Sequence, residues 1–251
     1  MIDCMEPWMG RTAAVVDLGM LKNNLAEIRK KLKPGVELMA VLKGDGYRHG
    51  AEGLYPTLKA CGVTNYAVAL WSEGVALREH GATEPILVLG DTRDYDLDEA
   101  VRYNLDFPVF SVEYAKTVRG SETAGRKQNI QIKLDTGMSR IGFPDNDETL
   151  EAIKEISQME SLNMTGISLH FARADEYDHK SAGKQLDRFL RMTEKLKGNG
   201  NHISEVSCGE QPGDFADAGF AARYGTCRRY LIWLESNRRR RVQKRELQGR
   251  F

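Results

Sequence analysis

The sequence has few cysteines and no long apolar run. Its 251 residues include four cysteines (Cys4, Cys61, Cys208 and Cys227), and no two of them form a Cys-x-x-Cys pair. Scattered cysteines are typical of reduced thiols, so they predict neither a disulfide framework nor a metal site. No stretch is apolar enough to span a bilayer, and residues 1–8 lack the basic and apolar regions of a signal peptide. We therefore expect a cytoplasmic protein with no bound metal and no membrane contact.

Net charge is also lacking, because 36 Lys and Arg residues balance 36 Asp and Glu residues. With 41% hydrophobic residues, this composition is that of an ordinary soluble protein and gives no reason to expect a nucleic-acid partner. The two signs of charge are unevenly distributed along the chain. Residues 223–251 contain ten basic and two acidic residues, whereas the first 222 residues contain 26 basic and 34 acidic ones.

Short apolar runs alternate with helical patterns along the first 209 residues. Connections of a few residues separate them, which is the pattern of a parallel sheet built from right-handed βαβ units. Ser72 and Ser111 are expected to cap two of the helices. Seven strands predict a TIM-like (β/α)8 barrel that is incomplete at the eighth strand. A doubly wound open sheet is the alternative, although no Gly-x-Gly-x-x-Gly supports a dinucleotide site. The expected strands are 38–42, 66–70, 84–90, 107–110, 130–134, 164–170 and 203–206.

One stretch, residues 36–50, places a lysine where a buried strand gives way to a glycine-rich loop. Lys43 follows the apolar run 38–42, and Gly44, Gly46 and Gly50 come after it. Desolvation at the end of a buried strand lowers the pKa of an ammonium group and makes the amine a nucleophile. The simpler interpretation is that Lys43 ends the strand and extends to solvent.

Other polar groups follow predicted strands at the same end. They are Lys133 and Asp135 after the fifth strand, His170 after the sixth, and the segment 207–209 after the seventh. In a barrel, the carboxyl ends of the strands form the active site. Taken singly, a lysine and an aspartate on a strand are typical of a rim ion pair, and a lone histidine is typical of a structural group.

The motifs together resemble the alanine racemases, a family of pyridoxal-phosphate enzymes built on a TIM-like barrel. The first motif is Ala-Val-Leu-Lys-Gly-Asp-Gly-Tyr-x-His-Gly, at residues 40–50. The resemblance implies that Lys43 forms the Schiff base with pyridoxal 5'-phosphate and that Tyr47 bonds its phosphate. The family usually has glycine after this tyrosine, where this sequence has Arg48.

Two further motifs follow in order, and since residues 16–24 and 85–90 also fit the family, the resemblance covers residues 11 to about 209. Lys-x-Asp-Thr-Gly-Met-x-Arg-x-Gly-Phe, at residues 133–143, implies that Arg140 approaches the phenolic oxygen of the cofactor and the substrate carboxylate. Lys133 would orient Arg140, and this lysine is carbamylated in some members. His-Phe-Ala-x-Ala-Asp-Glu, at residues 170–176, implies that His170 packs against the pyridine ring.

The resemblance implies an enzyme that interconverts L-alanine and D-alanine, which bacteria use for the cell wall. Lys43 would serve as acid or base on one face of the substrate Cα. In the family, which is homodimeric, a tyrosine from the partner's C-terminal domain acts on the other face. That domain has no counterpart in residues 1–251, so we expect little or no racemase activity. A non-catalytic pyridoxal-phosphate protein and a racemase of another amino acid, such as serine, remain alternatives.

The tail departs from the family. Residues 1–209 are expected to form the barrel domain, and residues 210–251 are an atypical basic tail. Read one base later, the codons of residues 210–216 and 223–229 can encode two family strings, Asn-Ser-Pro-Ala and Asp-Met-Val-Arg. We therefore hypothesise that the tail is out of frame, which would also explain the arginine run at 238–241.

A localisation signal and a nucleic-acid patch are the competing interpretations of that run. Residues 230–234 are apolar enough to take the place of the eighth strand.

Overall fold

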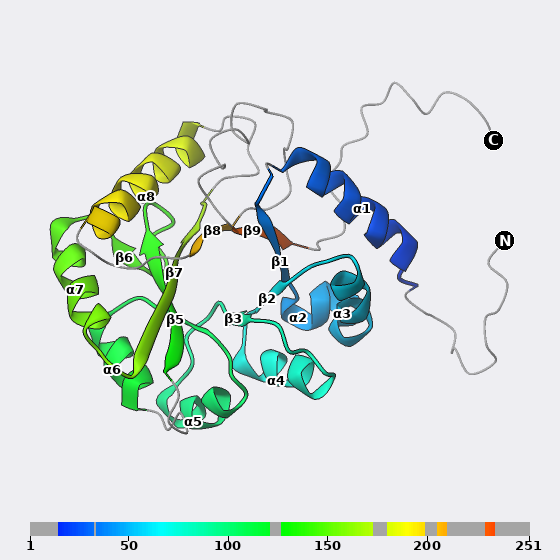
Figure 1. Cartoon of the computed structure of the whole chain (residues 1–251), viewed down its shortest axis with the longest axis horizontal. Helices are drawn as coiled ribbons and strands as arrows, with labels where there is room; N and C mark the ends of the chain where they lie inside the picture. The colour runs from blue at the N-terminus through cyan, green and yellow to red at the C-terminus, as the bar shows by residue number, and fades with distance from the viewer. Residues whose placement is uncertain are drawn as a thin grey trace, which may run out of the picture.

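The computed structural model describes residues 15–32, 34–120, 127–172, 180–198, 205–209 and 229–233. Within these residues the strands form the inner layer, and helices lie along the outside (Figure 1). All strand pairs are parallel. The (β/α) alternation expected from the sequence is therefore confirmed.

All seven expected strands are present, together with the two-residue strand β6 and the five-residue strand β9. In chain order the strands are β1 (Glu37–Val41), β2 (Asn65–Val68), β3 (Ile86–Val88), β4 (Phe107–Val109), β5 (Gln128–Asp135), β6 (Phe143–Pro144), β7 (Leu162–His170), β8 (Glu205–Gly209) and β9 (Arg229–Trp233). The helices are α1 (Leu18–Lys31), α2 (Lys43–Arg48), α3 (Ala51–Ala60), α4 (Trp71–Glu79), α5 (Asp94–Arg102), α6 (Val112–Gly120), α7 (Asp147–Ser157) and α8 (Lys180–Gly198).

The strand order is that of a barrel and not of a doubly wound sheet. The ladder runs β3-β2-β1-β9-β8-β7-β5-β4, and β6 pairs only with β5. Between β3 and β4 the pairing narrows to a single bridge, Leu87 to Asp106. Two backbone hydrogen bonds support this bridge, from Val88 N–H to Asp106 O (2.9 Å) and from Asp106 N–H to Ile86 O (2.8 Å). The strands thus form a (β/α)8 barrel in which β3 and β4 are joined by one isolated bridge.

The eighth position of the ring is filled by β9. This strand lies between β1 and β8 and pairs with both, joining Met39 and Gly209 to Leu231. The sequence predicts an incomplete barrel at this position, with residues 230–234 apolar enough to replace the eighth strand. The structure places Arg229–Trp233 there.

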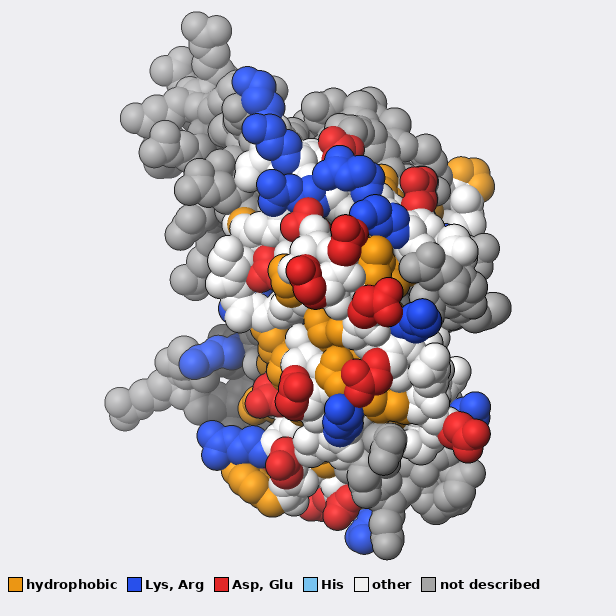
Figure 2. Space-filling view, turned by 90° about the vertical axis from the view of Figure 1, so that its left-hand side faces the viewer, with side chains coloured by type: hydrophobic (Ala, Val, Ile, Leu, Met, Phe, Trp, Pro, Cys, Tyr) orange, Lys and Arg blue, Asp and Glu red, His pale blue; other side chains and the backbone are white. Residues whose placement is uncertain are grey.

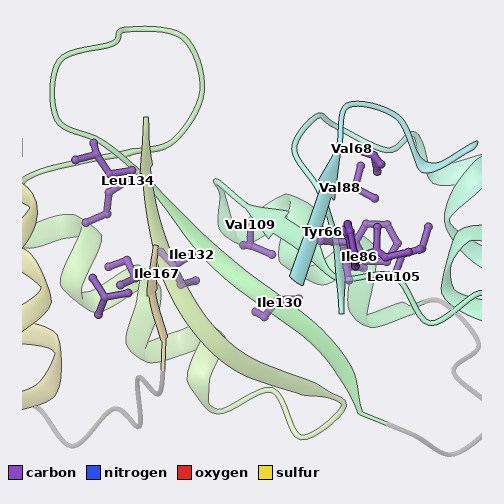
Figure 3. Close-up of a cluster of buried hydrophobic side chains, with 14 of the residues drawn as sticks. Tyr66, Val68, Ile86, Val88, Leu105, Val109, Ile130, Ile132, Leu134 and Ile167 are labelled. Atoms are coloured by element: carbon purple, nitrogen blue, oxygen red, sulfur yellow. The ribbon is translucent and has the colours of Figure 1, made fainter. Parts of the chain in front are cut away.

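Successive side chains along a strand point to opposite faces of the sheet, so the buried hydrophobic side chains form two clusters. The larger cluster lies between the strands and the helices and includes Tyr66, Val68, Ile86, Val88, Ile130, Ile132, Leu134 and Ile167 (Figure 3). The smaller cluster contains Met39, Val41, Ala67 and Leu87, which occupy the alternate positions and so face the barrel interior. The odd-numbered positions of β1 therefore point inward.

The outer surface carries charges of both signs. In the face shown in Figure 2, acidic and basic side chains are interspersed, with hydrophobic side chains between them. Exposed charges also form ion pairs, such as Lys195 with Asp147 and Lys116 with Glu155, both at 2.9 Å. No helix among the described residues is long and apolar enough to cross a membrane.

One of the two expected helix caps is confirmed. The Ser111 hydroxyl accepts a hydrogen bond from Tyr114 N–H at 3.0 Å, at the start of α6. The expectation for Ser72 was wrong, because α4 begins at Trp71 and Leu70 is its N-cap. The carboxylate of Glu73 accepts the backbone N–H groups there instead, which places a negative charge at a helix N-terminus.

Candidate active site

The same alternation brings three of the expected site residues to the barrel interior. Lys43 follows Met39 and Val41 in the inward series of β1. Lys133 alternates with Ile132 and Leu134, which face the helices. His170 likewise alternates with Leu169, which also faces the helices. All three lie at the carboxyl ends of parallel strands, where barrel active sites are found.

The segment after Lys43 is a turn of left-handed helix. Gly44, Asp45, Gly46 and Tyr47 have φ between 54° and 60° and ψ between 40° and 52°. Arg48 continues the series with φ 65°. Left-handed backbone costs roughly 1–2 kcal/mol for each residue that carries a Cβ. Backbone strain of this kind is concentrated at functional sites.

Hydrogen bonds hold this turn at both ends. Gly46 N–H donates to Leu42 O at 2.8 Å, and Ala51 N–H donates to Asp45 Oδ1 at 2.7 Å. The Tyr47 ring packs on the interior cluster, with its centroid 5.5 Å from Lys43 Nζ. The turn therefore returns the Tyr47 ring to the lysine that precedes it.

We expect Arg48→Gly to stabilise the fold by about 1 kcal/mol, because glycine adopts positive φ without steric cost. The free energy of urea unfolding measures this change. Arg191→Gly is the matched control, since exposed Arg191 lies in the right-handed helix α8. There glycine should destabilise by about 1 kcal/mol. Destabilisation by both substitutions would contradict the positive φ at Arg48.

Arg140 is positioned by a carboxylate of its own loop. Asp135 accepts hydrogen bonds from the backbone N–H groups of Gly137, Ser139 and Arg140, each at 2.9 Å. Burial acts to raise the pKa of Asp135, but these hydrogen bonds outweigh it and lower that pKa. Asp135 thus binds backbone N–H groups, a role that the rim ion pair considered from the sequence does not include. An aspartate before Thr-Gly is typical of such a turn.

The charges of the site converge on His170. Burial is the largest cause, and together with the positive charges of Lys133, Arg140 and Lys43 it lowers the pKa of His170 to about 3. Burial, together with the charge of Arg140, also lowers the pKa of Lys133 to about 8. His170 is therefore a neutral imidazole at physiological pH, and the charges of three cationic side chains act on it.

This depressed pKa predicts a loss of stability in mild acid. An unfolded histidine takes up its proton near pH 6.5, whereas folded His170 takes it up near pH 3. Stability from this source is complete above pH 6.5 and falls as the pH drops toward 3. We expect the wild type to lose about 2 kcal/mol more than His170→Gln between pH 7 and pH 5. Urea unfolding at the two pH values tests this, and equal losses would contradict the burial of His170.

Two positioning residues were not predicted from the sequence. Glu73 Oε1 accepts a hydrogen bond from Gly44 N–H at 2.6 Å, which joins α4 to the left-handed turn Lys43–Arg48, called the lysine turn below. Gln185 of α8 joins two loops, because its Oε1 accepts from Ala172 N–H (3.0 Å) and its backbone O accepts from the Thr136 hydroxyl (2.9 Å). An acidic residue in the first turn of α4 was the available signal for Glu73. We know of no signal for Gln185.

Asp175 and Glu176, which belong to the third motif, lie outside the described residues. The structure thus brings Lys43, Tyr47, Lys133, Arg140 and His170 to one end of the barrel. Polar and cationic side chains gathered at this end are typical of the active sites of (β/α)8-barrel enzymes.

The chain belongs to the alanine racemase family. Its residues 16–225 match the sequence model described as alanine racemase, N-terminal domain. It is 39% identical over 193 residues to alanine racemase of Clostridium tetani, a match that covers 76% of this chain and 49% of that protein. It is 36% identical over 196 residues to that of Desulforamulus reducens, covering 78% of this chain and 53% of that protein.

Solved structures agree with this assignment. The alanine racemase of Clostridium difficile 630 superposes with a TM-score of 0.79 at 30% identity, covering 85% of this chain and 55% of that one. The chain therefore spans about half the length of the curated relatives it matches. The TIM-like barrel is confirmed by this likeness.

Proposed function

We propose that this chain is the pyridoxal-phosphate-binding barrel of an alanine racemase and that Lys43 carries the cofactor. One observation supports this most directly. The charges of Lys43, Lys133 and Arg140 all act on a neutral His170 at the carboxyl end of the barrel. The whole reaction, the interconversion of L-alanine and D-alanine, is part of the proposal.

The described side chains fit this cofactor chemically. Pyridoxal phosphate is an anion with a flat ring, and the site offers three cationic side chains and an uncharged imidazole. Ser207 Oγ is buried in β8 and has no hydrogen-bond partner among the described residues, which leaves a polar group available in this part of the barrel. Residues 210–228, where the family places further phosphate contacts, lie outside the described part of the chain.

Each side chain has a distinct role in the proposal. Pyridoxal phosphate, when bound, acidifies the Cα–H of the amino acid attached to it. Lys43 holds the cofactor and then moves a proton on one face of that Cα. Arg140 binds the substrate carboxylate, Tyr47 bonds the cofactor phosphate, and His170 packs on the ring. Lys133 orients Arg140, and its lowered pKa supports a role as a reactive amine.

Covalent labelling of the full chain tests the cofactor site. The chain is incubated with pyridoxal phosphate, reduced with borohydride, digested, and examined by peptide mass. We expect the pyridoxyl label on Lys43 and its complete loss in Lys43→Ala. Lys30→Ala is the matched control, because Lys30 is exposed on α1, and it should keep the label. An unlabelled Lys43 in the wild type, or equal labelling of several lysines, would refute the proposal.

Exchange in D2O tests the substrate. A single proton-transfer group serves one face of Cα, whereas inversion needs a group on each face. We therefore expect the chain alone to incorporate deuterium into alanine faster than it inverts alanine. Chiral chromatography with mass detection separates the two processes. Exchange of serine in preference to alanine would assign the site to another amino acid.

The remaining parts of the proposal concern the setting of the protein. We propose that it is cytoplasmic, that the assembly of its family is a homodimer, and that the family reaction supplies D-alanine for the cell wall. We also propose that residues 210–251 are read out of frame. Sequencing the gene on both strands tests this, and an intact frame would disprove it.

A further inference from the structure

Glu73 connects two loops that are far apart in the sequence. Its Oε1 accepts from Gly44 N–H at 2.6 Å, and its Oε2 accepts from Ala69 N–H at 2.8 Å and from Leu70 N–H at 3.0 Å. All three donors are backbone amides, and Gly44 directly follows Lys43. Hydrogen bonds to a charged acceptor are about twice as strong as neutral ones.

The lysine turn needs such a contact for two reasons. Its first N–H groups have no acceptor within the turn, as at the start of any helix, and Gly44 is its second residue. In addition, Asp45, Tyr47 and Arg48 hold positive φ, which raises the energy of the turn. A turn under strain keeps its shape only where neighbouring groups hold it.

The backbone groups that bind Oε2 of Glu73 are held in place by the sheet. Ala69 and Leu70 directly follow β2, and β2 pairs with β1 in the register Ala67 to Val41. Glu73 also lies in the first turn of α4, where a helix N-terminus favours a carboxylate. The carboxylate therefore links the Lys43 backbone to a neighbouring strand and helix.

We propose that Glu73 is a positioning residue that fixes the backbone of Lys43, and hence the direction in which its amine meets the cofactor. This inference rests on the proposed function. Glu73 itself contacts neither substrate nor cofactor in this role. It acts through Gly44 N–H, so its loss changes the reactivity of Lys43 more than it changes the fold.

Glu73→Gln is the test variant, because an amide has one acceptor oxygen and cannot serve both sets of donors. We expect the rate at which pyridoxal phosphate attaches to Lys43 to fall about tenfold or more in Glu73→Gln. Asn146→Ala is the matched control. It also removes a side-chain cap, since Asn146 Oδ1 accepts from Thr149 N–H at 3.0 Å at the start of α7. This control should lose stability and keep the attachment rate.

Hydrogen exchange provides a second readout, which begins with the wild type. In the wild type, Gly44 N–H should exchange slowly because Glu73 binds it. Glu73→Asp, which is one methylene shorter, should speed that exchange while Asn146→Ala leaves it unchanged.

The outcomes separate the two proposals. If Lys43 is not labelled in the wild type, both the proposed function and this inference are wrong. Labelling of Lys43 at the same rate in wild type and Glu73→Gln removes this inference alone, as does rapid exchange of Gly44 N–H in the wild type. Slow attachment in both Glu73→Gln and Asn146→Ala would show only a structural role for Glu73 and would also overturn the inference.

Discussion

Replacing Leu231 with proline is expected to lower the free energy of unfolding by about 3 kcal/mol or more. Leu231 lies in the middle of β9, between Met39 of β1 and Gly209 of β8. Proline donates no backbone hydrogen bond, and it is tolerated in sheets essentially only at edges and bulges. Urea or thermal unfolding of the full chain measures the loss.

Asp94→Pro provides the control for this substitution. Asp94 is the first residue of α5 and is exposed, and Arg93 before it is extended with φ −67° and ψ 151°. Proline fits the first turn of a helix and follows an extended residue readily. We expect a change within about 1 kcal/mol. Equal stability of Leu231→Pro and wild type would mean that β9 does not belong to the barrel.

The second large effect is expected at Gly142, two residues after Arg140. A Cβ there would lie 2.8 Å from Asp135 N and 2.9 Å from the Leu134 carbonyl carbon, and φ is +141°. Both atoms are backbone at the end of β5, so they cannot rotate away. We expect Gly142→Ala to cost about 3 kcal/mol or more, from the φ strain and the clash together.

Gly81→Ala separates these two causes. Gly81 follows α4 with φ +85°, and no atom lies within 4 Å of a Cβ built on it. Alanine there should cost only about 1 kcal/mol, the penalty for left-handed backbone alone. Unfolding of both variants in urea gives the comparison. Similar losses for the two would show that the backbone of β5 yields to the new methyl group.

Strand positions were predictable because each strand is an apolar run bounded by turn residues. The run 38–42 appears as β1, and the run 130–134 lies within β5. Alternation then decides which side chains face inward, so the convergence of Lys43, Lys133 and His170 follows from the strand ends. This part of the site depends on local geometry, which the sequence contains.

The lysine turn could not be predicted in the same way. Gly44, Gly46 and Gly50 indicate a loop, but nothing in their spacing specifies that Asp45, Tyr47 and Arg48 adopt positive φ. These residues ordinarily avoid that region, and tertiary contacts impose it on them. The contact from Glu73 is one of these, and it joins positions 29 residues apart.

The N-cap prediction at Ser72 was wrong for a related reason. Ser72 looks like an N-cap by residue type, yet the carboxylate of Glu73 performs the capping from inside the first turn. Ser111 looks the same in the sequence and does cap its helix. Residue preference alone cannot distinguish the two cases, because the strand that precedes each helix fixes where the chain turns.

The place of β9 in the ring has a consequence for how this chain folds during synthesis. Each of the strands from β2 to β8 pairs with a strand close to it in sequence, whereas the pairing of β1 with β9 joins residues 39 and 231. A nascent chain emerges from its N-terminus, so the first strand must wait with one edge open until the last strand is made. Pairing across so many residues also carries a high loop-closure entropy and slows folding. The open edge of β1, the strand that precedes Lys43, is therefore exposed longest, and chaperone binding or aggregation during synthesis should begin there.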